Sequence, residues 1–254
     1  MTMEKFLQET IRTAGKIALK KFGKVGVKYT KSSPTDVVTE ADLAVDDFIV
    51  CTIKKKYPSH GIISEENGEH QSGAEYVWII DPIDGTRNFS KAAPLFAVMI
   101  GLARNGKMEL GAVYDPSMDE LVLARRGKGT FLNGQRVRGS DCKKWAESWG
   151  SLTSRFSDNG RKIIAQFMDH KPREPFWANS FGCIGINAIY LASGRRDWCV
   201  SSGSCLWDYA AVSIILKEAG YRVTNFKGKE WSFGDKELLA ANKYLYPKLL
   251  KILG

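Results

Sequence analysis

The amino-acid sequence predicts an α+β fold, in which helices are mixed with a sheet built from antiparallel hairpins. Residues 3–22 carry apolar side chains at helical spacing, and Gly23 follows as a natural helix stop. Residues 95–137 contain two Asn-Gly pairs, at 105–106 and 133–134, each between short β-prone segments. Because Asn-Gly is the strongest short hairpin signal, this region predicts a β-meander. A helix and hairpins in one chain, without an internal repeat, indicate the α+β class.

A second helix is predicted from its N-terminal signal. Thr39 is a good N-cap, and Asp42 stands three positions later in a capping-box-like arrangement, with Asp in place of the usual Glu. Residues 27–38 before it are expected to be extended, with a turn at 32–34. The helix is expected to end near Tyr57-Pro58. The segments that follow are expected to be a short strand at 61–64, a polar mobile loop at 67–75 and a buried strand at 77–80.

The remaining residues continue the alternation of helices and strands. Residues 139–147 predict a connection between an N-terminal half (about 1–140) and a C-terminal half (about 141–254) of one single domain, 1–254. The elements expected in the second half are strands at 148–153 and 197–201, helices at 159–169, 185–192, 208–219 and 243–253, and a hairpin at 221–231.

The segment after the strand at 77–80 carries the strongest chemical signal. Asp81 and Asp84 are separated by Pro82, which fixes a φ angle, and are followed by Gly85. Thr86 or Asn88 is expected to cap a following helix. Carboxylates that converge at a strand end are typical of a hard cation site, since Mg²⁺ and Ca²⁺ take oxygen ligands. Backbone N–H groups at the start of the next helix favour phosphate. The segment therefore indicates a site for phosphoryl chemistry, in preference to a purely structural Asp-Pro turn.

Composition restricts the function further. The net charge is +9 and the pI is about 9.2, which favours anionic ligands. The basic residues are scattered in short clusters, so we do not expect nucleic acid to be the main ligand. The chain starts directly in an amphipathic pattern, and no apolar run has the length of a membrane span. We therefore expect a cytoplasmic protein that has no membrane partner.

Several catalytic classes are excluded because the sequence lacks the motifs that they require. The five cysteines form no C-x-x-C pair, and the three histidines form no H-E-x-x-H zinc motif. The sequence contains no G-x-S-x-G nucleophile elbow. Residues 101–107 have the glycine-lysine spacing of a P-loop, but Met108 replaces the required Ser or Thr. The candidate chemistry that remains is acidic.

Three further carboxylates lie near predicted element ends. Glu65 follows the strand at 61–64, Asp42 lies in the first turn of a helix, and Asp208 opens another helix beside Trp207. Each has a simpler interpretation by itself, as a solvated loop acid, a residue that complements a helix dipole, or an N-cap. Taken together with Asp81 and Asp84, they follow a known family pattern.

The sequence resembles the inositol monophosphatase family of Mg²⁺-dependent, typically lithium-sensitive phosphatases, and the resemblance covers nearly the whole chain. Residues 31–42 are similar to its N-terminal motif, and Ile63-Ser64-Glu65-Glu66 is similar to its second motif. Residues 81–89 resemble its signature D-P-I-D-G-T-x-N-F, and Trp207-Asp208-Tyr209-Ala210-Ala211 resembles its W-D-x-A-A motif. The resemblance implies a layered αβαβα sandwich, commonly dimeric, so we expect a homodimer.

The resemblance also implies roles for individual residues. Two or three Mg²⁺ ions and a small phosphorylated substrate are expected. The metal ligands would be Glu65, Asp81, the Ile83 carbonyl, Asp84 and Asp208. The catalytic residues would be Thr86 and Asp42, which would orient the attacking water, together with Glu65. The substrate contacts would be Lys31 at the site entrance, Asp84, Gly85, Thr86, Gly182, Cys183, Ile184, Ser201 and Asp208.

Departures from the family pattern lie where the alcohol half of the substrate would bind. Ser201 stands where relatives often carry Glu, and Asn179 stands where they carry Arg. Cys183 and Ile184 replace smaller residues. The resemblance implies myo-inositol 1-phosphate as the default substrate, and these departures keep fructose 1,6-bisphosphate, histidinol phosphate, a 3′-phosphoadenosine nucleotide and NADP(H) as alternatives. An alternative of another class is a nucleic-acid or transcription-complex binding protein on the same fold.

Overall fold

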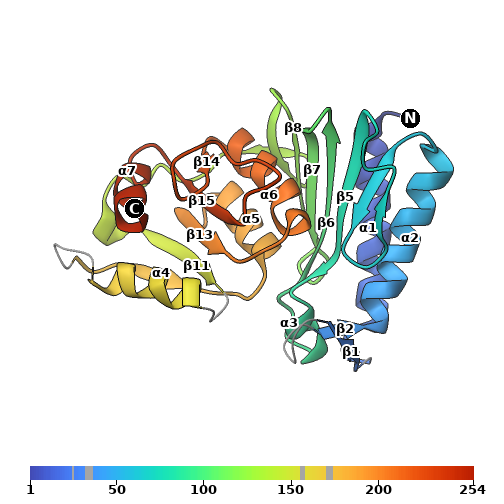
Figure 1. Ribbon diagram of the computed structural model, residues 1–254, viewed down its shortest axis with the longest axis horizontal. Helices are drawn as coiled ribbons and strands as arrows, with labels where there is room; N and C mark the ends of the chain where they lie inside the picture. Colours follow the sequence, from blue (N-terminus) through green and yellow to red (C-terminus); the bar gives the residue numbers. More distant parts are fainter. Residues whose placement is uncertain (25, 32–36, 155–157, 170–173) are drawn as a thin grey trace.

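The computed structural model describes residues 1–254 except 25, 32–36, 155–157 and 170–173. Within these residues five layers are stacked in the order helix, sheet, helix, sheet, helix (Figure 1). The layered αβαβα sandwich expected from the sequence is therefore confirmed. The helical layers are the pair α1 (Met3–Lys21) and α2 (Glu40–Lys56), the pair α5 (Ile184–Ala192) and α6 (Leu206–Glu218), and the pair α4 (Asp158–Asp169) and α7 (Tyr246–Leu253).

The larger sheet lies between the first two helical layers and is antiparallel, apart from the parallel pair β3 and β5. The expected β-meander forms most of it. Both Asn-Gly turns have positive φ angles at Asn and Gly, as a tight hairpin requires. Its strands in spatial order are β10 (Gln135–Val137), β9 (Gly129–Leu132), β8 (Glu120–Arg125), β7 (Lys107–Asp115), β6 (Ala97–Arg104), β5 (Tyr76–Asp84), β3 (Gly61–Ser64) and β4 (Gly68–His70).

The smaller sheet lies between α5–α6 and α4–α7, and it mixes parallel and antiparallel pairs. A separate two-stranded sheet, β1 (Val27–Thr30) with β2 (Val37–Thr39), leads into α2. Among the described helices, none is long and apolar enough to cross a membrane. The strands of the smaller sheet in spatial order are β12 (Trp177–Asn179), β11 (Trp149–Ser154), β13 (Trp198–Ser202), β15 (Glu237–Ala241) and β14 (Arg222–Thr224).

Strand β5 is apolar at consecutive positions because helices cover both faces of the sheet. Val77 and Ile79 pack in the cluster that contains α5 and α6, whereas Trp78 and Ile80 pack in the cluster that contains α1 and α2. All four side chains are buried. A strand that is covered on both sides carries a continuous apolar run in place of alternation. This packing holds β5 between two helical layers, with its acidic C-terminal end near the N-terminal ends of α2 and α6.

The end of β5 differs from the prediction. The strand does not stop at Ile80 but continues through Asp84. Its register with β6 shifts between Asp81, which faces Met99, and Asp84, which faces Ala97, so one extra residue is accommodated. Such a bulge tolerates Pro82, which cannot donate a ladder hydrogen bond. The bulge thus keeps both carboxylates in the sheet.

Other boundaries also needed correction. The predicted polar loop at 67–75 contains β4, which pairs with β3. The predicted hairpin at 221–231 is reduced to one isolated bridge between Thr224 and Glu230, because β14 pairs with β15 instead. Strand β12 was not predicted. The expected turn at 32–34 lies outside the described residues.

Candidate active site at the end of strand β5

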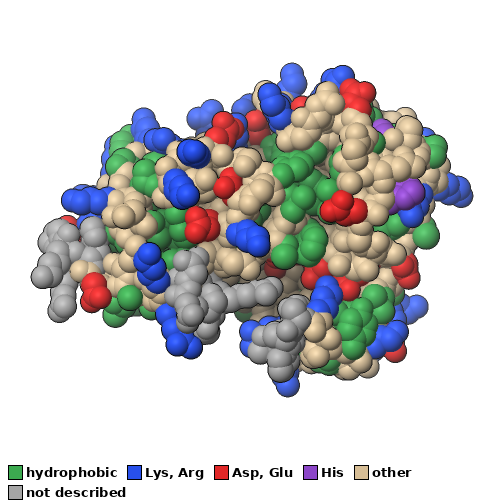
Figure 2. All heavy atoms as spheres, in the orientation of Figure 1, with side chains coloured by type: hydrophobic (Ala, Val, Ile, Leu, Met, Phe, Trp, Pro, Cys, Tyr) green, Lys and Arg blue, Asp and Glu red, His purple; other side chains and the backbone are tan. Residues whose placement is uncertain are grey.

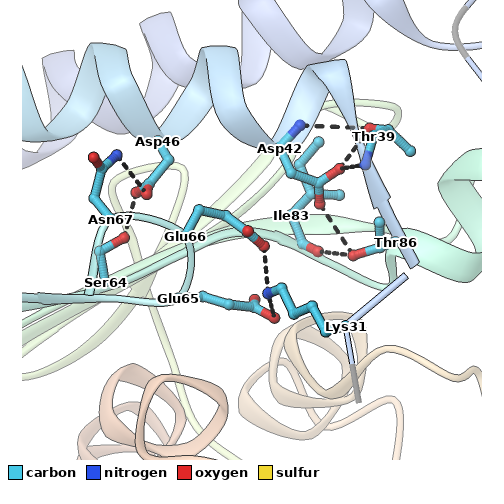
Figure 3. Close-up of polar contacts among 10 residues, drawn as sticks. All are labelled: Lys31, Thr39, Asp42, Asp46, Ser64, Glu65, Glu66, Asn67, Ile83 and Thr86. Atoms are coloured by element: carbon cyan, nitrogen blue, oxygen red, sulfur yellow. Dashed lines mark hydrogen bonds and ion pairs between the residues drawn. The ribbon is translucent and has the colours of Figure 1, made fainter. Parts of the chain in front are cut away.

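The first helix turn of α2 brings a carboxylate to the end of β5. Thr39 and Asp42 form the predicted capping box, in which the Thr39 N–H and hydroxyl donate to Asp42 Oδ2 over 2.8 and 2.5 Å. Asp42 Oδ1 accepts a hydrogen bond from Thr86 Oγ1 at 3.1 Å (Figure 3). Thr86 Oγ1 also lies 2.8 Å from the Ile83 carbonyl oxygen. One carboxylate therefore caps a helix with one oxygen and orients a hydroxyl with the other.

The predicted helix after β5 is the short α3 (Thr86–Ser90), and its cap differs from the prediction. Neither Thr86 nor Asn88 caps it; Gly85 occupies the N-cap position with φ +87° and no side-chain hydrogen bond. A Cβ at Gly85 would lie 2.7 Å from the Leu95 carbonyl oxygen, so glycine is required there. The Asn88 amide instead donates to the carbonyls of Leu95 and Phe181, each at 2.8 Å. Asn88 thus joins the signature segment to the loop that precedes α5.

Three aspartates meet at this position. Ligand oxygens of Asp81, Asp84 and Asp208 all lie within 4.8 Å of one another. Asp208 is not the N-cap of α6, because Cys205 has that position; Asp208 lies at N3, where its Oδ2 accepts from the Cys205 N–H at 2.5 Å in a capping box. The structure therefore brings together carboxylates that are separated by more than a hundred residues in the chain.

Asp84 is held by the N-terminal end of α5. Its Oδ2 accepts from the Gly185 N–H at 2.6 Å and from the Cys183 thiol at 2.9 Å. Burial, and then the adjacent Asp84, raises the pKa of Cys183 well above its usual range, so the thiol stays protonated and donates. Burial raises the pKa of Asp84 to about 6, although these two hydrogen bonds lower it.

Glu65 lies at the edge of the cluster in a pair with Glu66. The Lys31 ammonium contacts Glu65 at 2.9 Å and Glu66 at 2.6 Å (Figure 3). Burial, partly offset by Lys31, raises the pKa of Glu65 to about 7. Lys31 thus lies at the acidic cluster. Glu66, whose side chain is 3% exposed, was not among the predicted site residues.

Most of the residues predicted to contact the alcohol half of the substrate are buried in the structure. Gly182 has φ +64°, directly before the buried Cys183 and Ile184. Ser201 Oγ is fully buried and accepts from the Tyr209 hydroxyl at 2.9 Å. Tyr209 follows Asp208 in the chain, so this hydrogen bond connects Ser201 to the residue next to the carboxylate cluster. The sequence could not reveal that Ser201 has a partner within the protein.

The cluster has the chemistry of a divalent cation site. Asp81 is buried, and its Oδ1 has no hydrogen-bond partner among the described residues. Burial, followed by the charges of Glu65 and Asp84, raises the pKa of Asp81 far above its usual range. Buried carboxylates without partners repel one another, and a hard cation removes that cost. The donor set therefore fits Mg²⁺, and it has the oxygen-only composition that Mg²⁺ prefers.

Comparison with known proteins identifies the family. The model of the inositol monophosphatase family matches residues 1–254. The chain belongs to the inositol monophosphatase family. A "fructose-1,6-bisphosphatase/inositol-1-monophosphatase" from Thermotoga maritima is 34% identical over 249 residues, which cover 98% of this chain and 94% of the relative. An inositol monophosphatase structure from the same organism superposes with a TM-score of 0.89 at 32% identity, covering 98% of this chain and 95% of that one.

Other members of the family carry a different name. A protein named "Nus factor SuhB" from Escherichia coli K12 is 35% identical over 224 residues, covering 85% of this chain and 82% of that protein. The Bartonella henselae SuhB structure superposes with a TM-score of 0.91 at 28% identity, covering 98% and 97%. The family assignment supports phosphatase chemistry. The names of these relatives do not support the expectation that nucleic acid is an unlikely ligand.

Cys183 allows a direct test of how Asp84 is held. We expect Cys183→Ala to lower turnover about tenfold, because the Asp84 carboxylate loses one of its hydrogen-bond donors, which is worth roughly 1–1.5 kcal/mol. Cys183→Ser keeps a donor at the same position and should retain most of the activity. Steady-state phosphate release from both variants checks this. Equal activity of the Ala and Ser variants would contradict it.

The raised pKa values predict how pH affects the metal-free protein. Asp42 and Asp84 have pKa values of about 6 and Glu65 of about 7, all raised chiefly by burial. The folded protein therefore binds more protons than the unfolded chain between about pH 4 and pH 7, so its stability falls as pH rises through this window. Bound Mg²⁺ should offset that loss. We expect Mg²⁺ to raise Tm more at pH 8 than at pH 5, by roughly 3 °C or more; equal gains at both pH values would be inconsistent with this account.

Proposed function

We propose that this protein is a Mg²⁺-dependent phosphatase that hydrolyses a small phosphate monoester, with myo-inositol 1-phosphate as the default substrate. The observation that carries the proposal is the cluster of the buried Asp81 and Asp84 with the partly exposed Asp208, in which one Asp81 oxygen has no hydrogen-bond partner among the described residues. A hydroxyl oriented by a carboxylate lies beside it, at Thr86 and Asp42. The family assignment supports the same chemistry.

The metal would be held by the carboxylates and one carbonyl. We assign Glu65, Asp81 and the Ile83 carbonyl to one ion, Asp81, Asp84 and Asp208 to a second, and a weaker contribution of Glu65 to a third. When bound, such ions neutralise the charge of the phosphate group and lower the pKa of a coordinated water. This explains why no histidine base is required near the cluster.

The protein's own groups orient the reactants. Thr39 holds Asp42 Oδ2, so that Asp42 Oδ1 remains directed at the Thr86 hydroxyl. In the proposed mechanism, the Thr86 hydroxyl donates to Asp42 and its oxygen accepts a hydrogen bond from the water that attacks phosphorus. The N–H groups of Gly85 and Thr86 would bind phosphate oxygens, and Lys31 would add positive charge at the entrance. Such positioning supplies much of the rate enhancement in phosphoryl transfer.

The alcohol half of the substrate is identified by comparing phosphate release from a panel of phosphate monoesters. The name of the Thermotoga maritima relative supports testing inositol 1-phosphate and fructose 1,6-bisphosphate first. Histidinol phosphate, a 3′-phosphoadenosine nucleotide and NADP(H) complete the panel. The Ser201 hydroxyl oxygen already accepts a hydrogen bond from Tyr209. We therefore expect weaker discrimination among inositol-like alcohols than a carboxylate at position 201 would give.

The experiment measures phosphate release from each substrate with Mg²⁺, with EDTA, and with Mg²⁺ plus Li⁺. We expect release that requires Mg²⁺ and falls when Li⁺ is added. Size-exclusion chromatography with light scattering tests the accompanying proposal that the protein is a homodimer. Failure to release phosphate from any substrate would contradict the proposed activity.

A second candidate function is binding to nucleic acid or to a transcription complex. Relatives named "Nus factor SuhB" and the net charge of +9 favour it. Figure 2 shows Lys and Arg side chains scattered over one face, both at its edge and in its middle, interspersed with acidic ones and not as one continuous stripe. Filter binding of single-stranded RNA at rising salt tests this candidate. Retention only at very low salt would indicate non-specific attraction.

A further inference from the structure

Helix α2 presents two buried carboxylates one turn apart toward the site. Asp42 and Asp46 have the i, i+4 spacing that places side chains on one helix face. Asp42 contacts Thr86 at the end of β5, whereas Asp46 contacts the segment between β3 and β4 (Figure 3). Only Asp42 has a role in the mechanism proposed above. Asp46 is fully buried nonetheless, which calls for a reason.

Each carboxylate oxygen of Asp46 has a donor from that segment. Oδ1 accepts from the Ser64 hydroxyl, and Oδ2 accepts from the Asn67 side-chain amide at 2.9 Å. Hydrogen bonds to an ionised carboxylate are about twice as strong as those between neutral groups. Asp46 therefore fixes the last residue of β3 and the residue just before β4.

The two residues between these anchors are Glu65 and Glu66. The Glu65 N–H donates to the Ile80 carbonyl at 3.2 Å, which ties the same turn to β5. Both glutamates contact Lys31. The turn 64–67 is thus held from α2 on one side and from β5 on the other, with its acidic side chains directed away from α2 toward Lys31 (Figure 3).

We propose that Asp46 is a positioning residue, which sets the affinity of the site for its divalent cation by holding the turn that carries Glu65. The inference rests on the proposed function. Asp81 and Asp84 are placed by β5 and Asp208 by α6, so loss of the Asp46 anchors should act mainly on the cation site that includes Glu65. The expected consequence is weaker Mg²⁺ dependence of the reaction, with a turnover that recovers at high Mg²⁺.

The test compares Asp46→Asn and Asn67→Ala with the wild-type protein. Asp46→Asn keeps the shape but presents an amide group to two donors, and Asn67→Ala removes one anchor from an exposed position without changing the buried carboxylate. The matched control is Lys55→Gln, which removes a charge from an exposed position in the last turn of α2. For each protein, Tm is measured at rising Mg²⁺ without substrate, and kcat and KM are measured at the same Mg²⁺ concentrations.

We expect both variants to need about tenfold more Mg²⁺ for half-maximal activity and for half of the Tm increase. At saturating Mg²⁺ their kcat and KM should return to within about threefold of wild type, and the control should differ by less than twofold throughout. Unchanged Mg²⁺ midpoints with a uniformly lower Tm would overturn the inference, because Asp46 would then have a structural role only. If Asp46→Asn does not fold, the Mg²⁺ midpoints of Asn67→Ala test the inference in the same way.

Failure of the proposed function would give a different result. In that case the wild-type protein would release no phosphate from any substrate at any Mg²⁺ concentration. The Tm titration uses the metal alone, so it still compares the Mg²⁺ midpoints of the variants with that of the wild type.

Discussion

Asp84→Asn is expected to abolish Mg²⁺-dependent phosphate release, by about a thousandfold or more, while it stabilises the metal-free protein. The amide oxygen can accept the hydrogen bonds that Cys183 and Gly185 now donate to Asp84 Oδ2. The amide NH₂ group would then face Asp81 and Asp208, where it would donate to carboxylates that otherwise repel each other. An amide NH₂ group cannot coordinate a cation, so we expect the variant to lose activity while the metal-free protein becomes more stable.

Two measurements check this expectation. Phosphate release at saturating Mg²⁺ should fall to background, and Tm in EDTA at pH 8 should rise relative to wild type. Asp208→Asn should lose activity in the same way. Asp119→Asn, which removes an exposed carboxylate paired with Arg12, serves as the control and should keep full activity. Near-normal Mg²⁺-dependent activity of Asp84→Asn would refute the metal assignment.

Thr86→Val is expected to lower kcat by roughly a hundredfold to ten-thousandfold, the range typical for loss of a general acid–base contact. Valine keeps the shape of threonine but has no hydroxyl to orient water or to donate to Asp42 Oδ1. KM should change little, because substrate binding would rest on metal and backbone groups. Thr86→Ser keeps the hydroxyl and should recover much of the rate.

The partnership of Thr86 with Asp42 is tested by a double-mutant cycle. If the two residues act as one unit, Asp42→Asn combined with Thr86→Val should cost little more than the larger single effect. Because Asp42 also caps α2, the folding of its variants is followed by circular dichroism. Strictly additive losses in kcat would show that the two side chains act independently.

Local signals predicted local structure well. The capping box of Thr39 and Asp42, and the hairpins at both Asn-Gly pairs, depend on residues within one turn, and the structure confirms them. The acidic residues could be selected from the sequence because carboxylates beside apolar strands are costly without a partner. In the structure, ligand oxygens of Asp81, Asp84 and Asp208 lie within 4.8 Å of one another. The sequence predicted that these residues converge only through the family resemblance, and not through their spacing.

Features that depend on distant partners were missed or placed wrongly. The continuation of β5 through Pro82 depends on a bulge against β6, and β14 pairs with β15 in place of the hairpin predicted at 221–231. The bond between Cys183 and Asp84 joins residues 99 positions apart, and no local pattern indicates it. Asp46 looked like an ordinary helix residue, because its buried contacts are made only after α2 packs beside the turn 64–67.

The claim that the carboxylates at the end of β5 form a divalent metal site is tested most directly by diffraction. Crystals soaked in Mn²⁺, an anomalous scatterer that takes the same oxygen ligands as Mg²⁺, would be examined in an anomalous difference map. We predict the strongest peaks within bonding distance of Asp81, Asp84 and Asp208, with Glu65 at one of them. A map whose strongest peaks lie elsewhere, or that has none between these carboxylates at millimolar Mn²⁺, would contradict the account.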